Sequence, residues 1–168
     1  LKMNTQNKIN EQNETNETII LIGNGVRECA ILYKLLESPN SSKYSFVSIG
    51  TNVNPFLERN SRFFKIDSFC LDQFENLDKQ FPNLFCSKVT MAIIGPEAPI
   101  ANKVEEWLET KDIFTIAPNS TAAQIETSKL YLRLLLDNDP ILKRHNPQFV
   151  SICKGANIDS VNNIDVSK

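Results

Sequence analysis

Short apolar runs alternate along this chain with segments of helical spacing, and this alternation limits the possible folds more than any other feature. Five runs have the length and composition of buried strands, at 18–22, 45–49, 63–66, 89–94 and 113–116. Between them, apolar residues recur at helical spacing around 31–36, 71–81 and 100–108. Strands that alternate with helices form βαβ units, whose parallel strands are joined by right-handed crossovers. The sequence therefore predicts an α/β fold, in which helices cover both faces of a parallel sheet.

The region after residue 118 is predicted to be mainly helical. Thr121 and Gln124 have the spacing of a capping box, which marks the start of a helix. The helical pattern continues to about residue 137, with an expected break near Thr127-Ser128. Residues 148–153 are predicted to form a last strand.

Composition separates the start of the chain from the rest. Residues 1–17 are rich in Asn, Gln and Glu and nearly lack apolar side chains. Burial there cannot offset the entropy lost on ordering, so we expect a flexible polar tail. The predicted sheet begins directly after this tail, at residue 18.

Charge, cysteine content and hydropathy exclude several classes of protein. The formal net charge is −2, whereas nucleic-acid binders present a basic face. No apolar stretch approaches the roughly 18 residues of a membrane helix, and no secretory signal pattern is found. Four scattered cysteines and a single histidine predict neither a zinc site nor a disulfide framework. We therefore expect a cytoplasmic protein without a metal site, a nucleic-acid partner or a membrane partner.

The first candidate site is the turn at Gly23-Asn24-Gly25, between a predicted strand and a predicted helix. Its glycines would let the backbone pass close to a ligand, and the amino end of the helix would offer N–H groups to an anion. Arg27 and Glu28 follow at the start of that helix. The same residues could equally form a tight turn with no ligand, and the motif alone leaves both interpretations open.

Two further candidates follow at the ends of later elements. Pro96 and Glu97 would place one carboxylate at the edge of the sheet, where it could bind a sugar hydroxyl or an amine. Alternatively, Glu97 is an acid in the first turn of a helix, where negative charge is favoured by about 0.3–1 kcal/mol. Lys129 could contact ATP phosphates, or it could be an ordinary solvated lysine.

A dinucleotide-binding domain is disfavoured by two departures from its fingerprint. The third small residue of that fingerprint is replaced by Glu28. The acid that would hold a ribose hydroxyl is also missing from 48–52, after the second predicted strand. A free-standing domain that binds NAD therefore ranks below the other hypotheses.

Taken together, these segments resemble one enzyme family. Residues 22–30 (IGNGVRECA) resemble the opening G-N-G-x-R-E-H-A of the phosphoribosylamine–glycine ligases, which belong to the ATP-grasp superfamily. Residues 94–100 (IGPEAPI) are similar to that family's G-P-E-A-P-L, and 117–129 are similar to its G-P-T-x-x-A-A-Q-[LI]-E-x-S-K. The order and spacing agree over roughly 18–153, and the segments around 52–55 and 146–149 are most similar to the archaeal-type branch.

The resemblance implies a fold and an activity. Residues 18–118 would be a Rossmann-like, pre-ATP-grasp domain that binds substrate, and 119–168 would be a linker helix with the truncated start of an ATP-grasp domain. The complete enzyme would be an ATP-dependent carbon–nitrogen ligase of de novo purine biosynthesis. It would join 5-phosphoribosylamine to glycine, using ATP and Mg²⁺ or Mn²⁺. Such an enzyme has small-molecule substrates, and we expect a monomer.

The resemblance also assigns residues to roles. Lys129 would bind ATP, and no catalytic residue is assigned. The expected substrate-binding residues are Asn24, Gly25, Arg27, Glu28, Pro96 and Glu97.

Some positions depart from the family pattern. Cys29 stands where the family has histidine, and Val26 stands where the bacterial pattern has glycine. The family's glycine-rich ATP loop and its magnesium-binding carboxylates would lie beyond Lys168, so we expect that residues 1–168 alone do not complete the reaction. The alternative is a non-catalytic or decayed Rossmann-like module that binds a phosphoribosyl compound or a nucleotide.

Overall fold

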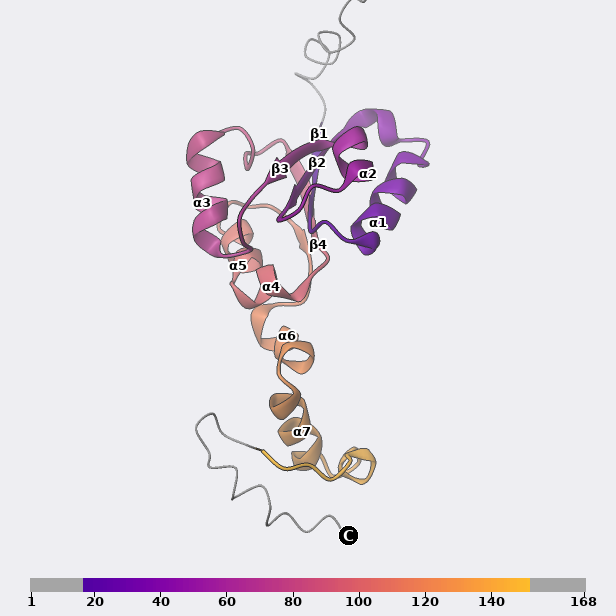
Figure 1. Cartoon of the computed structure of the whole chain (residues 1–168), viewed down its shortest axis with the longest axis vertical. Coiled ribbons are helices and arrows are strands. Elements are labelled where there is room, and N and C mark those ends of the chain that lie inside the picture. The colour runs from indigo at the N-terminus through magenta and orange to yellow at the C-terminus, as the bar shows by residue number, and fades with distance from the viewer. Residues whose placement is uncertain (1–16, 152–168) are drawn as a thin grey trace, which may run out of the picture. The chain divides into compact units, whose positions relative to one another are not determined.

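The computed structural model describes residues 17–151. Its centre is a parallel sheet of five strands in the order β3-β2-β1-β4-β5 (Figure 1). This confirms the predicted α/β class and its parallel sheet. The strands are β1 (Glu17–Ile22), β2 (Tyr44–Gly50), β3 (Arg62–Lys65), β4 (Val89–Ile94) and β5 (Thr115–Ile116).

Helices flank the sheet on both faces, as the sequence predicts. α1 and α2 lie on one face, whereas α3 and α5 lie on the other (Figure 1). Two 3-10 turns, Ser41–Lys43 and Lys143–His145, complete the regular structure. The helices are α1 (Val26–Leu36), α2 (Pro55–Asn60), α3 (Leu71–Gln80), α4 (Glu97–Ala101), α5 (Val104–Glu109), α6 (Ser120–Thr127) and α7 (Lys129–Asn138).

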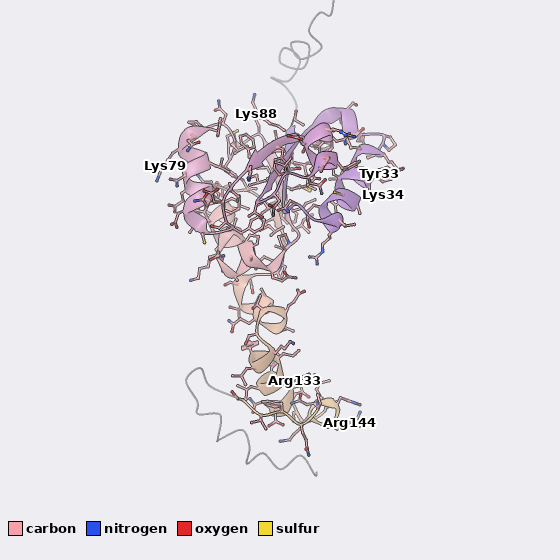
Figure 2. All side chains as sticks on the ribbon, viewed as in Figure 1. Tyr33, Lys34, Lys79, Lys88, Arg133 and Arg144 are labelled. Atoms are coloured by element: carbon pink, nitrogen blue, oxygen red, sulfur yellow. The ribbon has the colours of Figure 1, made fainter. Side chains whose placement is uncertain are left out.

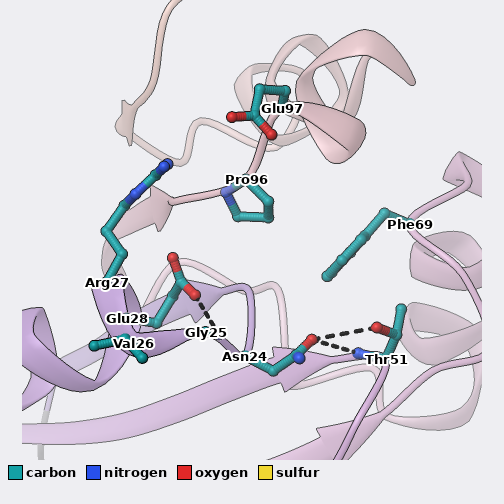
Figure 3. A pocket seen from close by; sticks show the side chains of 9 residues that line it. All are labelled: Asn24, Gly25, Val26, Arg27, Glu28, Thr51, Phe69, Pro96 and Glu97. Atoms are coloured by element: carbon teal, nitrogen blue, oxygen red, sulfur yellow. Dashed lines mark hydrogen bonds between the residues drawn. The ribbon is translucent and has the colours of Figure 1, made fainter.

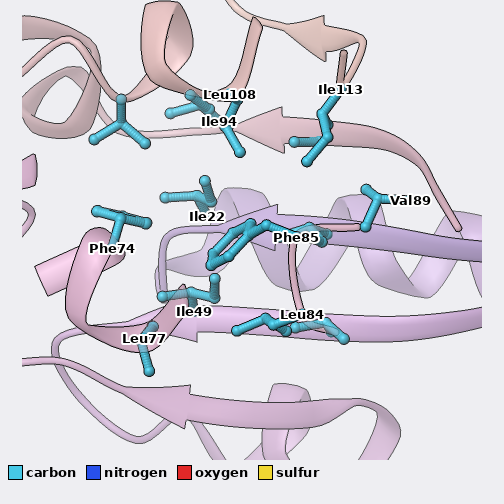
Figure 4. Close-up of a cluster of buried hydrophobic side chains, with 14 of the residues drawn as sticks. Ile22, Ile49, Phe74, Leu77, Leu84, Phe85, Val89, Ile94, Leu108 and Ile113 are labelled. Atoms are coloured by element: carbon cyan, nitrogen blue, oxygen red, sulfur yellow. The ribbon is translucent and has the colours of Figure 1, made fainter. Parts of the chain in front are cut away.

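The core consists of two clusters, one on each side of the sheet. Successive side chains of a strand point to opposite faces, so Ile20 and Ile22 of β1 enter the cluster on the α3 side. Ile19 and Leu21 enter the cluster on the α1 side. Figure 4 shows the larger cluster, in which Phe74 lies near Ile22 and Ile49. Burial on both faces explains why β1 reads as one continuous apolar run.

Two helices differ from the sequence prediction. The expected helix around 100–108 is interrupted, because Lys103 adopts a left-handed conformation (φ 61°) and separates α4 from α5. α2 was not predicted at all. It is one and a half turns long, and it begins where the Asn54 side chain accepts hydrogen bonds from the N–H groups of Phe56 and Leu57. A helix this short has too few residues for an amphipathic pattern to be visible.

Three local predictions are corrected by the structure. α6 is capped by Asn119, whose Oδ1 accepts from the N–H of Ala122 at 2.8 Å, so the predicted capping box of Thr121 and Gln124 is wrong. Glu17, assigned to the tail, is the first residue of β1. Residues 148–151 form no strand, and the rest of that predicted strand lies outside the described residues, as do residues 1–16 of the tail.

The described chain divides into two compact units. The first continues through Thr127 and so includes α6, whereas the sequence analysis expects a boundary at residue 118. The second begins at Ser128, whose hydroxyl accepts from the N–H of Tyr131 and caps α7 at the expected break in the helix. Within this unit, the side chain of Asn146 exchanges hydrogen bonds with Arg133, which Figure 2 labels. The start of an ATP-grasp domain remains a prediction for this region.

Each helix within 17–151 is too short or too polar to cross a membrane.

Two phenylalanines offer a matched test of the core. Phe74 is fully buried, whereas the side chain of Phe114 is 65% exposed. We expect Phe74→Ala to lower the free energy of unfolding by about 3–5 kcal/mol, because it leaves a cavity. Phe114→Ala should lower it by less than about 1 kcal/mol. Urea unfolding measures both values, and equal losses would contradict the assigned core.

Candidate functional site

A pocket of about 400 Å³ opens at the carboxyl ends of β1, β2 and β4 (Figure 3). This is the edge at which parallel sheets bind ligands, and β1 and β4 form the point where the strand order reverses. All six residues that the resemblance assigns to substrate line this one pocket, although they come from motifs about 70 residues apart. The lining consists of Asn24, Gly25, Val26, Arg27, Glu28, Thr51, Phe69, Pro96 and Glu97.

Glu28 is the buried acid of this pocket. Its carboxylate oxygen Oε2 accepts a hydrogen bond of 2.6 Å from the N–H of Gly25, the residue that precedes α1. The side chain of Glu28 folds back over the first turn of its own helix and is only 5% exposed. This is the carboxylate half of a capping box, which satisfies one of the orphan N–H groups at a helix start.

The glycines around Glu28 provide the space for its carboxylate. A Cβ atom on Gly95 would overlap Oε1 of Glu28, and one on Gly23 would lie 2.6 Å from its Cδ. Gly23 also has a φ of +130°, a backbone conformation that residues other than glycine rarely adopt. The two glycine motifs thus have a reason in packing, because both loops approach one buried carboxylate. The glycine motif alone could not show that the Glu28 carboxylate fills this space.

Arg27 makes a second connection between the same two loops. Its Nη1 donates a hydrogen bond to the carbonyl oxygen of Gly95, at the end of β4. Among the nine lining residues, Arg27 is the only cation. Its side chain is exposed, and Figure 3 shows it extending along one side of the pocket toward Pro96 and Glu97. The start of α1 therefore holds the end of β4 through two adjacent side chains.

Asn24 connects the end of β1 to the loop after β2. Its Oδ1 accepts from the N–H of Thr51 at 2.9 Å and from the hydroxyl of Thr51 at 3.3 Å. The side-chain NH₂ of Asn54 donates to the backbone carbonyl of Asn24 at 3.0 Å. A backbone N–H must point at an acceptor, so the end of the Asn24 amide near Thr51 is its oxygen and the opposite end is its NH₂. Within residues 17–151 this NH₂ has no acceptor, so it remains available to a ligand.

Glu97 is the first residue of α4, on the far side of the pocket from Asn24 (Figure 3). Its own backbone N–H and a side-chain hydrogen bond with Glu126 lower the pKa of the Glu97 carboxyl, and the charge of Arg27 lowers it further. These effects outweigh a small opposing effect of burial. The group is therefore an anion at neutral pH, as the sequence analysis assumed for its binding role.

Sequence reasoning missed three lining residues: Val26, Thr51 and Phe69. Thr51 directly follows β2, so the strand order would have indicated it once β2 was known to neighbour β1. Val26 was noted only as a departure from a family pattern. Phe69 lies in the loop between β3 and α3, and no motif there marks it as different from the phenylalanines of the core.

Lys129 is not among the residues that line this pocket. Lys129 is the first residue of α7 and belongs to the second compact unit, so its role toward ATP remains a prediction. Within the described residues, no group of three or more His, Cys, Asp or Glu side chains could hold a metal ion.

The sheet order and the position of the pocket define a Rossmann-like α/β domain. The family model described as "Phosphoribosylglycinamide synthetase, N domain" matches residues 17–126. The chain therefore belongs to this family, which confirms the resemblance seen in its motifs.

Curated relatives carry the name phosphoribosylamine–glycine ligase. The protein from Methanocaldococcus jannaschii is 35% identical over 119 residues, which are 70% of this chain and 24% of that protein. The one from Nostoc sp. is 30% identical over 118 residues, which are 70% of this chain and 26% of that protein. The one from Pseudomonas syringae is 27% identical over 134 residues, or 80% of this chain and 29% of that protein. The chain thus aligns with about a quarter of the length of these relatives.

The packing of Glu28 against Gly95 predicts a strong coupling between the two residues. We expect Gly95→Ala to lower the free energy of unfolding by about 1–3 kcal/mol, because the added methyl group displaces the carboxylate from the N–H of Gly25. In a chain that already carries Glu28→Ala, the same change should have an effect of less than about 0.5 kcal/mol. Urea unfolding of the four proteins measures this cycle. Equal effects of Gly95→Ala in both backgrounds would show that the carboxylate does not fill this space.

Proposed function

We propose that this domain binds the phosphoribosyl substrate of a phosphoribosylamine–glycine ligase in the pocket at the sheet edge. One observation carries the proposal: six residues from two family motifs, distant in sequence, line a single pocket where parallel sheets bind ligands. Its volume of about 400 Å³ is in the range of small-molecule sites.

The start of α1 is suited to the phosphate group. The N–H groups in the first turn of a helix have no intrahelical acceptors, and the helix dipole favours an anion there. Because Glu28 already occupies the N–H of Gly25, the N–H groups of Val26 and Arg27 are the donors that a phosphate would use. The Arg27 guanidinium lies on the same side of the pocket and adds a positive charge.

The polar groups on the other walls are suited to the sugar and its amine. The free NH₂ of Asn24 and the hydroxyl of Thr51 can hydrogen-bond to ribose hydroxyls. The anionic Glu97 can accept from a hydroxyl or an amine. Glu28 has a different role in this proposal: it positions the two loops and does not need to touch the ligand.

The reaction of the whole protein is part of the proposal. It would join 5-phosphoribosylamine to glycine at the expense of ATP, with Mg²⁺ or Mn²⁺, in the cytoplasm and as a monomer. The described residues do not fit a metal site, so we derive no metal chemistry from them. Lys129 would contact ATP from the second unit.

Arg27 provides the test. We expect the chain to bind glycinamide ribonucleotide, the product of this reaction, and Arg27→Met to weaken that binding by about tenfold or more, because a charged hydrogen bond contributes about 1.5–3 kcal/mol. Isothermal titration calorimetry measures the affinity.

Arg59→Met is the matched control, since Arg59 is an exposed arginine on α2 outside the pocket lining. Its affinity should equal that of the unsubstituted chain. If both variants lose affinity equally, the binding reflects net charge only, and the pocket is not the phosphate site.

A further inference from the structure

Phe69 is the one aromatic residue among the nine that line the pocket. It lies in the loop between β3 and α3, between the polar residues Ser68 and Cys70. Part of its side chain packs against the core cluster on the α3 side, and part lines the pocket. Figure 3 shows its ring extending into the pocket above Thr51, from the side opposite Arg27.

The loop that carries Phe69 is held in place by its backbone. The N–H of Ile66 donates to the carbonyl of Gly50 at 3.0 Å, which fixes the start of the loop to the end of β2. The N–H of Asp67 donates to the side chain of Gln73 at 3.3 Å, which joins the loop to α3. The ring is thus presented from a constrained loop, so little ordering is needed when a ligand binds.

The chemistry of the pocket indicates what the ring contacts. Arg27 and the start of α1 attract the anionic end of a ligand, while Asn24 and Thr51 lie near the ring and offer polar atoms. A furanose ring has C–H groups on its faces and hydroxyls on its edge. It can therefore place a face on an aromatic ring while its hydroxyls bond to the polar residues beside it. A phosphate without a sugar gains nothing from the ring.

We propose that Phe69 is a specificity-determining residue, whose ring packs against the furanose of the phosphoribosyl ligand and selects it over phosphates without a ring. The proposal rests on the proposed function, because it takes the anion to bind at Arg27. Phe69 acts by apolar contact with the sugar and takes no part in the chemical step.

The test compares two ligands of the full chain, ribose 5-phosphate and sn-glycerol 3-phosphate, by titration. Phe69→Leu should weaken binding of ribose 5-phosphate by about five- to tenfold, since the flat aromatic face that packs against the sugar is lost. Binding of glycerol 3-phosphate should change by less than about twofold. Phe69→Tyr keeps the ring, so this variant should bind ribose 5-phosphate with the affinity of the unsubstituted chain.

Phe81→Leu is the control, because Phe81 is a partly exposed phenylalanine that packs against Phe64 outside the pocket lining. It should leave both affinities unchanged.

An unchanged affinity of Phe69→Leu for ribose 5-phosphate, or an equal loss for both ligands, overturns the proposal, because the ring would then have no preference for the sugar. If Phe69→Leu has no effect while Arg27→Met still weakens binding, only the role of Phe69 fails. If the unsubstituted chain binds no ribose 5-phosphate, the proposed function fails with it.

Discussion

The pocket depends on one buried carboxylate. Glu28 accepts from the N–H of Gly25 and occupies space that side chains on Gly23 and Gly95 would fill. It therefore fixes the start of α1 and fills the space between this turn and the end of β4, which is already paired with β1. Arg27 strengthens this contact by donating to the carbonyl of Gly95. Without the Glu28 carboxylate, the N–H of Gly25 would lose its acceptor and the space between the two loops would be unfilled.

Asn24 holds the loop on the other side of β1, which follows β2. Its carbonyl oxygen holds Thr51, and the absence of a side chain on Gly50 lets Asn24 come close, since a Cβ there would lie 2.7 Å from the Cβ of Asn24. One short segment after β1, residues 24–28, thus organises both neighbouring loops through side-chain contacts. In the proposed function, the polar residues of this turn have two roles. Glu28 supports the two loops, whereas Arg27 and the side-chain NH₂ of Asn24 would bind the substrate.

Much of the fold could be predicted from the sequence, because its signals are local. β1 reads as a continuous apolar run since both of its faces are buried, and α1 and α3 show helical spacing over three turns. The motifs that carry the six expected site residues lie at one edge of the sheet, and the role of these residues toward substrate remains a prediction. The predictions that were wrong depend on the conformation of single residues. Lys103 adopts a left-handed conformation and divides α4 from α5, and the side chain of Asn119 caps α6. Thr51 and Phe69 could not be predicted as lining residues, because only the strand order places β2 and then β3 on one side of β1.

The most direct measurement is a titration of the isotopically labelled chain with glycinamide ribonucleotide, followed through the ¹H–¹⁵N resonances of its backbone amides. If the sheet edge is the phosphoribosyl site, the largest changes occur at Gly25, Arg27, Thr51 and Glu97, which line the pocket. The opposite ends of the strands, at Tyr44 and Val89, should remain unchanged. Changes centred on those opposite ends, with none around the pocket, would contradict the account.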